Sequence, residues 1–166
     1  METIANDFTI NIATANGTGS QSANLILLQS MFEMGIPVSG KNMFPSNISG
    51  LPTWYIARLS DHGYQAPGDR THIQILVNPA TWDEDLASLE SGSVVIWNSD
   101  AKREMNRDDV ISYPVPMSSL ARKINPKIAK LVTNIVYVGI LAEMLGIEQA
   151  ALVSALTKQF KGNERA

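Results

Sequence analysis

The chain has 166 residues, of which 45% are hydrophobic, and its formal net charge is −3. This length suffices for one domain with a hydrophobic core, and the acidic balance gives no support for nucleic-acid binding. Because there is no cysteine, the chain can form no disulfide and can ligate no iron–sulfur cluster. Residues 1–7 lack a signal-peptide pattern and no apolar run is long enough to span a membrane, so we expect a cytoplasmic protein without membrane contact.

Strand-like and helix-like segments alternate, which predicts an α/β fold, a Rossmann-like three-layer domain with a mostly parallel sheet. No linker divides the sequence, so we expect residues 1–166 to form a single domain. In chain order we predict a strand over 8–14, a helix over 21–34, an extended segment at 36–40, a strand over 53–60, a strand over 72–77, a helix over 82–89, strands over 93–98 and 110–115, and helices over 118–123, 127–145 and 147–158.

Several side chains favour structural roles. Thr81 and Glu84 have the spacing of a helix capping box, and acidic residues 83–85 suit the positive end of a helix. Trp54 and Tyr55 are neighbours in a strand, so we expect them to face opposite sides of the sheet, at least one of them in the core. The two histidines have no companion at ligand spacing, which argues against a metal site.

The most informative segment joins the first predicted strand to the first predicted helix. A strand, a tight glycine turn and a helix N-terminus form a typical anion site, because backbone N–H groups and the helix dipole favour negative charge. We therefore predict that a phosphate-bearing ligand contacts Asn16, Gly17, Thr18, Gly19, Ser20, Gln21 and Ser22.

The spacing Gly17-x-Gly19-x-x-Ser22 is close to the dinucleotide fingerprint G-x-G-x-x-G. The acidic ribose-binding residue expected about 20 positions later is missing, which argues against NAD. There is no P-loop motif either. The residues themselves leave two interpretations open, a phosphate-bearing ligand other than NAD and a tight turn that binds nothing.

Two runs resemble the gamma domain of 2-oxoacid:ferredoxin oxidoreductases. The first is the glycine loop with Ala23 and Asn24, and the second extends from Met34-Gly35-Ile36-Pro37-Val38 through Pro45-Ser46-Asn47 to Trp54-Tyr55. The chain is most similar to the subtype in which this domain is fused ahead of the alpha subunit. The resemblance covers nearly the whole chain and implies a Rossmann-like fold.

The sequence departs from the general family pattern at several places. Ser20 and Ser22 replace two glycines of the family loop G-x-G-G-Q-G, and Ile48-Ser49-Gly50 replaces R-G-G. These changes agree with the fused subtype. The sequence stops where that subtype would continue into its thiamine-binding part, so an isolated domain, a truncated form and a split subunit all stay open.

The resemblance implies a component of an enzyme that converts a 2-oxoacid, with 2-oxoglutarate favoured, and coenzyme A to acyl-CoA and reduces ferredoxin. Thiamine diphosphate, magnesium and iron–sulfur clusters would belong to partner alpha and beta subunits, and ferredoxin would be an indirect partner. Coenzyme A would be a co-substrate, and we expect no tightly bound cofactor in this chain. We expect the glycine loop to hold the coenzyme A diphosphate, assisted by Lys41, Ser46, Asn47 and Gly50.

No residue pattern indicates a catalytic group, so we expect no turnover by the chain alone. Residues 122–130 contain a modest basic cluster, interpreted either as a contact for the 3′-phosphate of coenzyme A or as a solvated surface. Two further hypotheses stay open, an assembly module that binds no ligand and a free-standing nucleotide-binding sensor. A homodimer also stays open.

Overall fold

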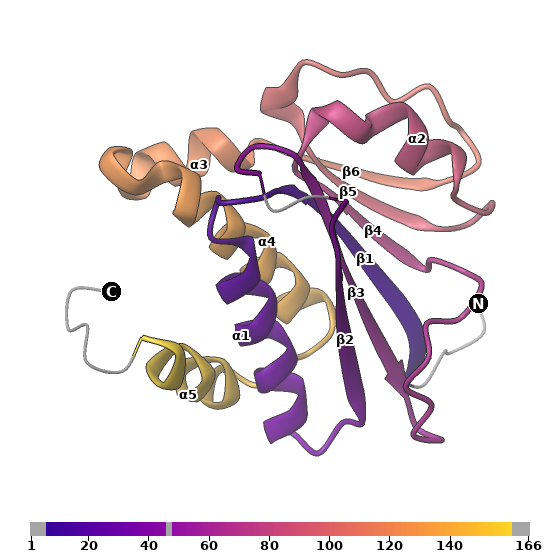
Figure 1. Ribbon diagram of the computed structural model, residues 1–166, viewed down its shortest axis with the longest axis vertical. Coiled ribbons are helices and arrows are strands. Elements are labelled where there is room, and N and C mark those ends of the chain that lie inside the picture. Colours follow the sequence, from indigo (N-terminus) through magenta and orange to yellow (C-terminus); the bar gives the residue numbers. More distant parts are fainter. Residues whose placement is uncertain (1–5, 46–47, 161–166) are drawn as a thin grey trace.

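The computed structural model describes residues 6–45 and 48–160 (Figure 1). Every predicted strand and helix is present there, with bounds that shift by a few residues. The strands are β1 (Asp7–Ala15), β2 (Val38–Met43), β3 (Pro52–Ser60), β4 (Ile73–Leu76), β5 (Val94–Asn98) and β6 (Ile111–Val115). The helices are α1 (Ser20–Glu33), α2 (Trp82–Ala87), α3 (Met117–Ile124), α4 (Ala129–Met144) and α5 (Gln149–Gln159), with short 3₁₀ helices η1 (Pro79–Thr81), η2 (Ser99–Ala101) and η3 (Pro126–Ile128).

The six strands form one sheet in the order β2-β3-β1-β4-β5-β6. Strands β1, β4, β5 and β6 pair in parallel, whereas β3 runs antiparallel to both of its neighbours, β1 and β2. The prediction of a mostly parallel sheet is therefore confirmed, with β3 reversed. The reversal follows from the short connection between β2 and β3, which pair as an antiparallel hairpin.

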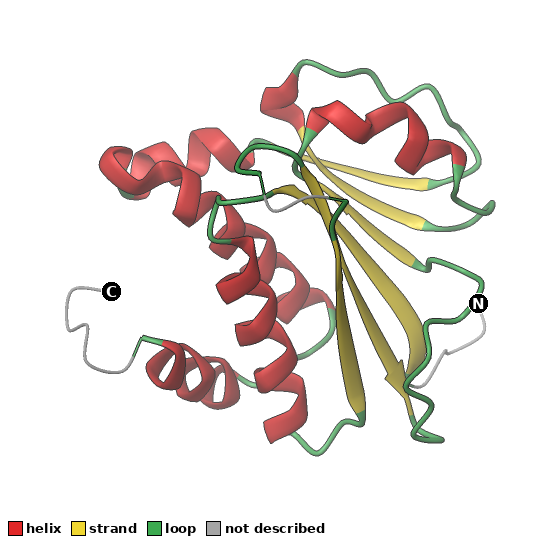
Figure 2. Cartoon of the chain, viewed as in Figure 1, coloured by secondary structure: helices red, strands yellow, loops and turns green. Residues whose placement is uncertain are grey.

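Helices cover the two faces of the sheet unequally (Figure 2). Helices α1, α4 and α5 lie on one face, over the larger of two hydrophobic cores, and α2 lies on the other face, over the smaller core. Ile10 and Ile12 of β1 are fully buried in the larger core. Burial of an aliphatic side chain of this size stabilises a fold by about 1.5–3 kcal/mol.

Helix α1 follows the apolar periodicity of its sequence. Its buried positions include Ala23, Ile26, Leu27, Ser30 and Met31, spaced three and four residues apart as one helix face requires. Ser30 fits among the apolar residues because its hydroxyl donates to the Ile26 carbonyl at 2.6 Å. The predicted stop near residue 35 is confirmed, since the residue there is a glycine with a φ of 77° that closes the last turn.

Thr81 occupies the N-cap position of α2, as predicted, but its side chain forms no capping hydrogen bond. The Asn78 side chain accepts a hydrogen bond from the backbone N–H of Ala80 at 3.1 Å and opens η1, and α2 follows directly. Pro79 occupies the first position of that 3₁₀ helix, where its fixed φ and missing N–H are tolerated, so the cap lies before the proline. The Thr81 hydroxyl instead donates to Asp85 Oδ2 at 2.6 Å.

Acidic residues occupy the first turn of α2, as predicted, but they differ in exposure. Asp83 and Glu84 are exposed, but Asp85 is buried. Its carboxylate also accepts a hydrogen bond from Trp54 Nε1 at 2.7 Å. Burial raises the pKa of Asp85, and the bonds from Thr81 and Trp54 oppose that shift only in part.

Trp54 and Tyr55 face opposite sides of the sheet, as predicted. Tyr55 packs in the larger core, where burial raises its pKa to about 12, and Trp54 lies against the smaller core below α2. No helix in the described part of the chain has the length and hydropathy that crossing a membrane requires.

Candidate functional site

The glycine loop joins the end of β1 to the start of α1 (Figure 1). Gly17 and Gly19 have φ values of 79° and 82°, a region that residues with a side chain rarely adopt. Among the described residues no side chain caps the first turn of α1, and this turn contains no acidic residue. Its backbone N–H groups and the positive end of its dipole therefore favour an anion.

The outer faces of both glycines are occupied by the protein itself. A Cβ atom built on Gly17 would lie 2.6 Å from the hydroxyl of Ser49, and one on Gly19 would overlap the side chain of Leu131 in α4. A phosphate therefore approaches this loop through its N–H groups and flanks rather than across the faces of the two glycines.

Hydrogen bonds from both sides fix the loop. Asn134 of α4 donates through Nδ2 to the carbonyl oxygen of Thr18 at 2.7 Å. The backbone of Asn16 exchanges hydrogen bonds with residues 50 and 51 at 2.9 and 2.8 Å. Tyr137, one turn further along α4, donates to Asn24 Oδ1 at 2.6 Å, and both side chains are buried. The loop is thus held in one conformation before any ligand binds.

Two pockets share the glycine loop as a wall. The first, which we name the α1 pocket, has a volume of about 240 Å³ and is lined by Asn16, Ser20, Gln21, Asn42, Phe44 and Thr53. The second, which we name the switch-point pocket, has a volume of about 320 Å³ and is lined by Ala15, Thr18, Gly50, Val77, Asn78, Pro79, Asn98, Ser118, Lys130, Thr133 and Asn134.

The switch-point pocket lies where the chain changes sides of the sheet. The neighbouring parallel strands β1 and β4 are followed by α1 on one face and α2 on the other. Ligands of open α/β sheets bind in the crevice at this point, outside the carboxyl ends of the strands. Its lining combines apolar surface with hydroxyl and amide side chains, and Lys130 contributes a positive charge.

The structure brings five predicted site residues to these pockets. Asn16, Ser20 and Gln21 line the α1 pocket, and Thr18 and Gly50 line the switch-point pocket. They surround one loop at one end of the sheet, which is the arrangement that the glycine pattern predicts.

Other predicted site residues lie elsewhere. Ser22 turns toward α5, where its hydroxyl accepts a hydrogen bond from Gln159 Nε2 at 3.3 Å. Lys41 is exposed in the middle of β2, opposite Ile56, and not at the end of the strand as predicted, because β2 continues to Met43. Ser46 and Asn47 lie outside the described residues.

Two asparagines at the carboxyl ends of parallel strands were not predicted as site residues. Asn78 comes after β4, and Asn98 ends β5. Each side chain accepts a hydrogen bond from the backbone N–H two residues later, and Asn98 also donates to the Ser118 hydroxyl at 2.9 Å. The available signal was an asparagine directly after each of two buried strands, since parallel strands end at the same edge of the sheet.

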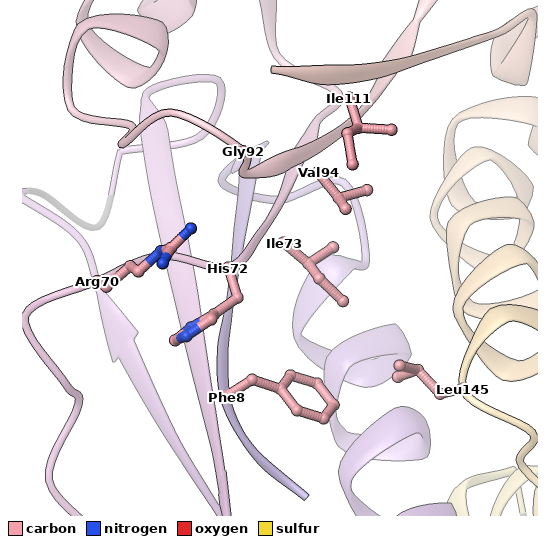
Figure 3. Close-up of a pocket in the computed structure, with 8 residues that line it drawn as sticks. All are labelled: Phe8, Arg70, His72, Ile73, Gly92, Val94, Ile111 and Leu145. Atoms are coloured by element: carbon pink, nitrogen blue, oxygen red, sulfur yellow. The ribbon is translucent and has the colours of Figure 1, made fainter. Parts of the chain in front are cut away.

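A third pocket lies at the opposite, amino end of the strands (Figure 3). Phe8, Ile73, Val94, Ile111 and Leu145 line most of its volume of about 250 Å³. Arg70 and His72 extend away from this apolar group on the other side of the strand ends. Burial lowers the pKa of His72, with help from the nearby positive charges of Arg70 and Arg58. None of the predicted site residues lines this pocket.

Within residues 6–45 and 48–160 no group of histidine, aspartate and glutamate side chains could hold a metal ion. The glycine loop, with the two pockets beside it, is the candidate binding site. Its lining offers N–H, amide, hydroxyl and ammonium groups that suit a polyanion.

Comparison with known protein families shows which family the chain belongs to. Residues 9–166 match the pyruvate ferredoxin/flavodoxin oxidoreductase family. The chain belongs to this family. No curated protein matches the chain.

Three solved structures share the fold of this oxidoreductase domain. A 2-oxoglutarate:ferredoxin oxidoreductase from Magnetococcus marinus, with 2-oxoglutarate, coenzyme A and succinyl-CoA bound, superposes with a TM-score of 0.79 and 22% identity over 96% of this chain and 28% of that one. The gamma subunit of a keto/oxoacid ferredoxin oxidoreductase from Geobacter sulfurreducens superposes with a TM-score of 0.73 and 18% identity, over 91% of this chain and 85% of that one. The pyruvate oxidoreductase subunit PORC from Thermotoga maritima superposes with a TM-score of 0.72 and 16% identity, over 94% of this chain and 86% of that one.

The chain therefore spans 28% of the Magnetococcus marinus protein but matches most of the length of the two separate subunits. A family match over residues 9–166 identifies it as a component of an oxidoreductase. The sequence resemblance to gamma domains, which rests on the glycine loop and on residues 34–55, is confirmed.

Proposed function

We propose that the whole chain is the gamma domain of a 2-oxoacid:ferredoxin oxidoreductase and that it binds coenzyme A. In this proposal, alpha and beta partner subunits hold thiamine diphosphate, magnesium and iron–sulfur clusters and pass electrons to ferredoxin. The 2-oxoacid is decarboxylated on those subunits, and its acyl group is transferred to the coenzyme A thiol. The first 2-oxoacid to test is 2-oxoglutarate, which is bound in the Magnetococcus marinus structure.

The observation that carries the proposal is the switch-point pocket, with its amide, hydroxyl and Lys130 groups, beside an uncapped helix N-terminus in a chain of this family. The first-turn N–H groups of α1 suit the diphosphate. Lys130 supplies a positive charge for a second phosphate group, and Asn98 and Asn134 supply amides that suit a nucleotide.

Lys130 gives the sharpest test. In an enzyme assembled from this chain and the thiamine-binding subunits of the same organism, Lys130→Gln should raise the KM for coenzyme A by about ten-fold, as loss of a charge-assisted hydrogen bond predicts. The KM for the 2-oxoacid should stay the same. Steady-state reduction of ferredoxin at varied coenzyme A measures both constants.

Lys158→Gln is the matched control, because it removes the same charge from exposed α5, where Lys158 pairs with Glu33. Its KM for coenzyme A should equal that of the unchanged enzyme. An unchanged KM in Lys130→Gln would show that coenzyme A does not use the switch-point pocket.

A second candidate function is an assembly module that binds no ligand. The occupied faces of Gly17 and Gly19 favour it, because Ser49 and Leu131 already fill part of the space that a diphosphate would use in an open glycine loop. This candidate predicts that neither lysine substitution changes the KM for coenzyme A, so the same experiment separates the two functions.

A further inference from the structure

Helix α3, η3 and the first turn of α4 form a projecting corner beside the glycine loop (Figure 1). Its aliphatic side chains are unusually exposed: Leu120 by 37%, Ile124 by 70%, Ile128 by 47% and Leu131 by 49%. Between them lie four exposed basic side chains. We name this surface the basic corner, and it consists of Leu120, Arg122, Lys123, Ile124, Lys127, Ile128, Lys130 and Leu131.

The charge of the basic corner contrasts with that of the chain. Residues 110–142 contain these four basic residues and no acidic one, although the net charge of the whole chain is −3. Among the described residues, the salt bridges involve none of the four. The nearest carboxylate in the contacts of this corner is Asp100, which accepts bonds from the backbone N–H and the hydroxyl of Ser119. Arg122 interacts with this carboxylate, whereas Lys123, Lys127 and Lys130 form no salt bridge among the described residues, so the corner keeps a net positive charge.

Single exposed aliphatic residues are ordinary, but four on one pair of packed helices, interspersed with basic side chains, favour a protein interface. The basic corner is also continuous with the candidate site. Leu131 lies over Gly19, and Lys130 lines the switch-point pocket. A protein seated on the corner would cover the mouth of that pocket and exclude water from it.

We propose that the basic corner is the surface on which the thiamine-binding subunits dock, through an apolar patch of theirs that is rimmed with carboxylates. The inference rests on the proposed function and specifies its partner contact. Four positive charges between four exposed aliphatic side chains are complemented by a surface of this chemistry. Docking there places the partner beside the switch-point pocket, where an acyl group from the partner could reach a bound thiol.

The absence of cysteine from the chain gives a direct test. Ile124→Cys places one thiol in the basic corner, and Val153→Cys places one on α5, where Val153 is 53% exposed. Each variant is labelled with a maleimide, alone and after assembly with the thiamine-binding subunits. Mass spectrometry of the peptide that contains the thiol gives the labelling rate, and size-exclusion chromatography reports assembly.

Assembly should slow labelling of Ile124→Cys by about ten-fold or more, since a thiol in an interface core is shielded from solvent, and should leave Val153→Cys nearly unchanged. If the complex forms and Ile124→Cys still reacts at its free rate, the docking surface is wrong and the proposed function stands. If no complex forms, both are wrong. If anionic vesicles protect Ile124→Cys and the subunits do not, the corner binds membranes and the inference fails.

Discussion

Two hydrogen bonds, one of them fully buried, connect α4 to the glycine loop and to the helix that follows it. The Asn134 side chain donates a hydrogen bond to the Thr18 carbonyl oxygen, and the Tyr137 hydroxyl donates one to the Asn24 amide oxygen. Burial raises the pKa of Tyr137, so its hydroxyl keeps its proton and acts as a donor at physiological pH. The shape of the candidate site therefore depends on side chains more than 100 residues away in sequence.

Tyr137→Phe should lower the free energy of unfolding by about 1–2 kcal/mol, because the substitution leaves a buried amide oxygen of Asn24 without its donor. Chemical denaturation followed by circular dichroism measures the change. Tyr113→Phe is the control, since Tyr113 is 50% exposed and should lose almost nothing. Equal effects of the two substitutions would contradict a structural role for the Tyr137 hydroxyl.

Asp85 makes the stability of the chain depend on pH. Because burial raises its pKa, the folded chain holds this proton more tightly than the unfolded chain. Its contribution to stability is therefore complete below the ordinary value of 3.8 and is lost as the pH rises through the raised pKa. Denaturation of the unchanged chain and of Asp85→Asn across this range should show this pH dependence only in the unchanged chain.

Asp85→Ala separates charge from hydrogen bonding. It should cost about 1–3 kcal/mol at neutral pH, because Trp54 Nε1 and the Thr81 hydroxyl lose their buried acceptor. Asp85→Asn keeps one acceptor oxygen and should be the more stable of the two variants. The account of this residue fails if the alanine variant is as stable as the asparagine variant.

Among the elements, β2 and β3 pair over six residues and make one especially close side-chain contact. A Cβ atom on Gly40 of β2 would overlap the ring and hydroxyl of Tyr55 in β3. The tyrosine therefore covers the glycine, and this fixes how the edge strand lies on the sheet. Asn42 near the end of β2 and Phe44 just after this strand line the α1 pocket.

Gly40→Ala should destabilise the fold by about 1–3 kcal/mol through this overlap. The same substitution in a Tyr55→Phe background should cost less, since the hydroxyl that meets the new methyl group is gone. A double-mutant cycle of thermal unfolding measures the difference. Additive effects of the two substitutions would show that the overlap is relieved in another way.

The local sequence predicted these elements because each depends on its own periodicity and turn residues. In helix α1 the buried positions recur every three or four residues, and a glycine ends the helix. Thr81 precedes α2, but its hydroxyl bonds to Asp85, and Asn78 caps the preceding η1. The burial of Asp85 depends on contacts such as that with Trp54, which lies 31 residues earlier. Contacts between distant segments leave no periodic signal in a single sequence.

The candidate site was predictable to the same extent. Asn16, Thr18, Ser20 and Gln21 belong to one motif, and local pattern places them together. The remainder of the switch-point pocket comes from the ends of β4 and β5 and from α3 and α4, which only the folded sheet brings together. These residues are Asn78, Asn98, Ser118, Lys130 and Thr133.

At the scale of the whole molecule, the proposed ligand site and docking surface lie at one end. Both pockets beside the glycine loop and the basic corner gather around the carboxyl ends of the parallel strands (Figure 1). The opposite end carries the apolar pocket of Phe8 and Leu145. This polarity fits a domain that presents coenzyme A to a partner subunit and does not catalyse a reaction by itself.

Calorimetric titration with coenzyme A, with NAD and ATP as comparison ligands, shows directly whether the switch-point pocket is a coenzyme A site. We predict that the assembled enzyme binds coenzyme A, that Lys130→Gln weakens this binding by about ten-fold while Lys158→Gln leaves it unchanged, and that NAD and ATP give no heat of binding at this site. Binding of NAD in place of coenzyme A, or a coenzyme A affinity that Lys130→Gln does not alter, would contradict the account.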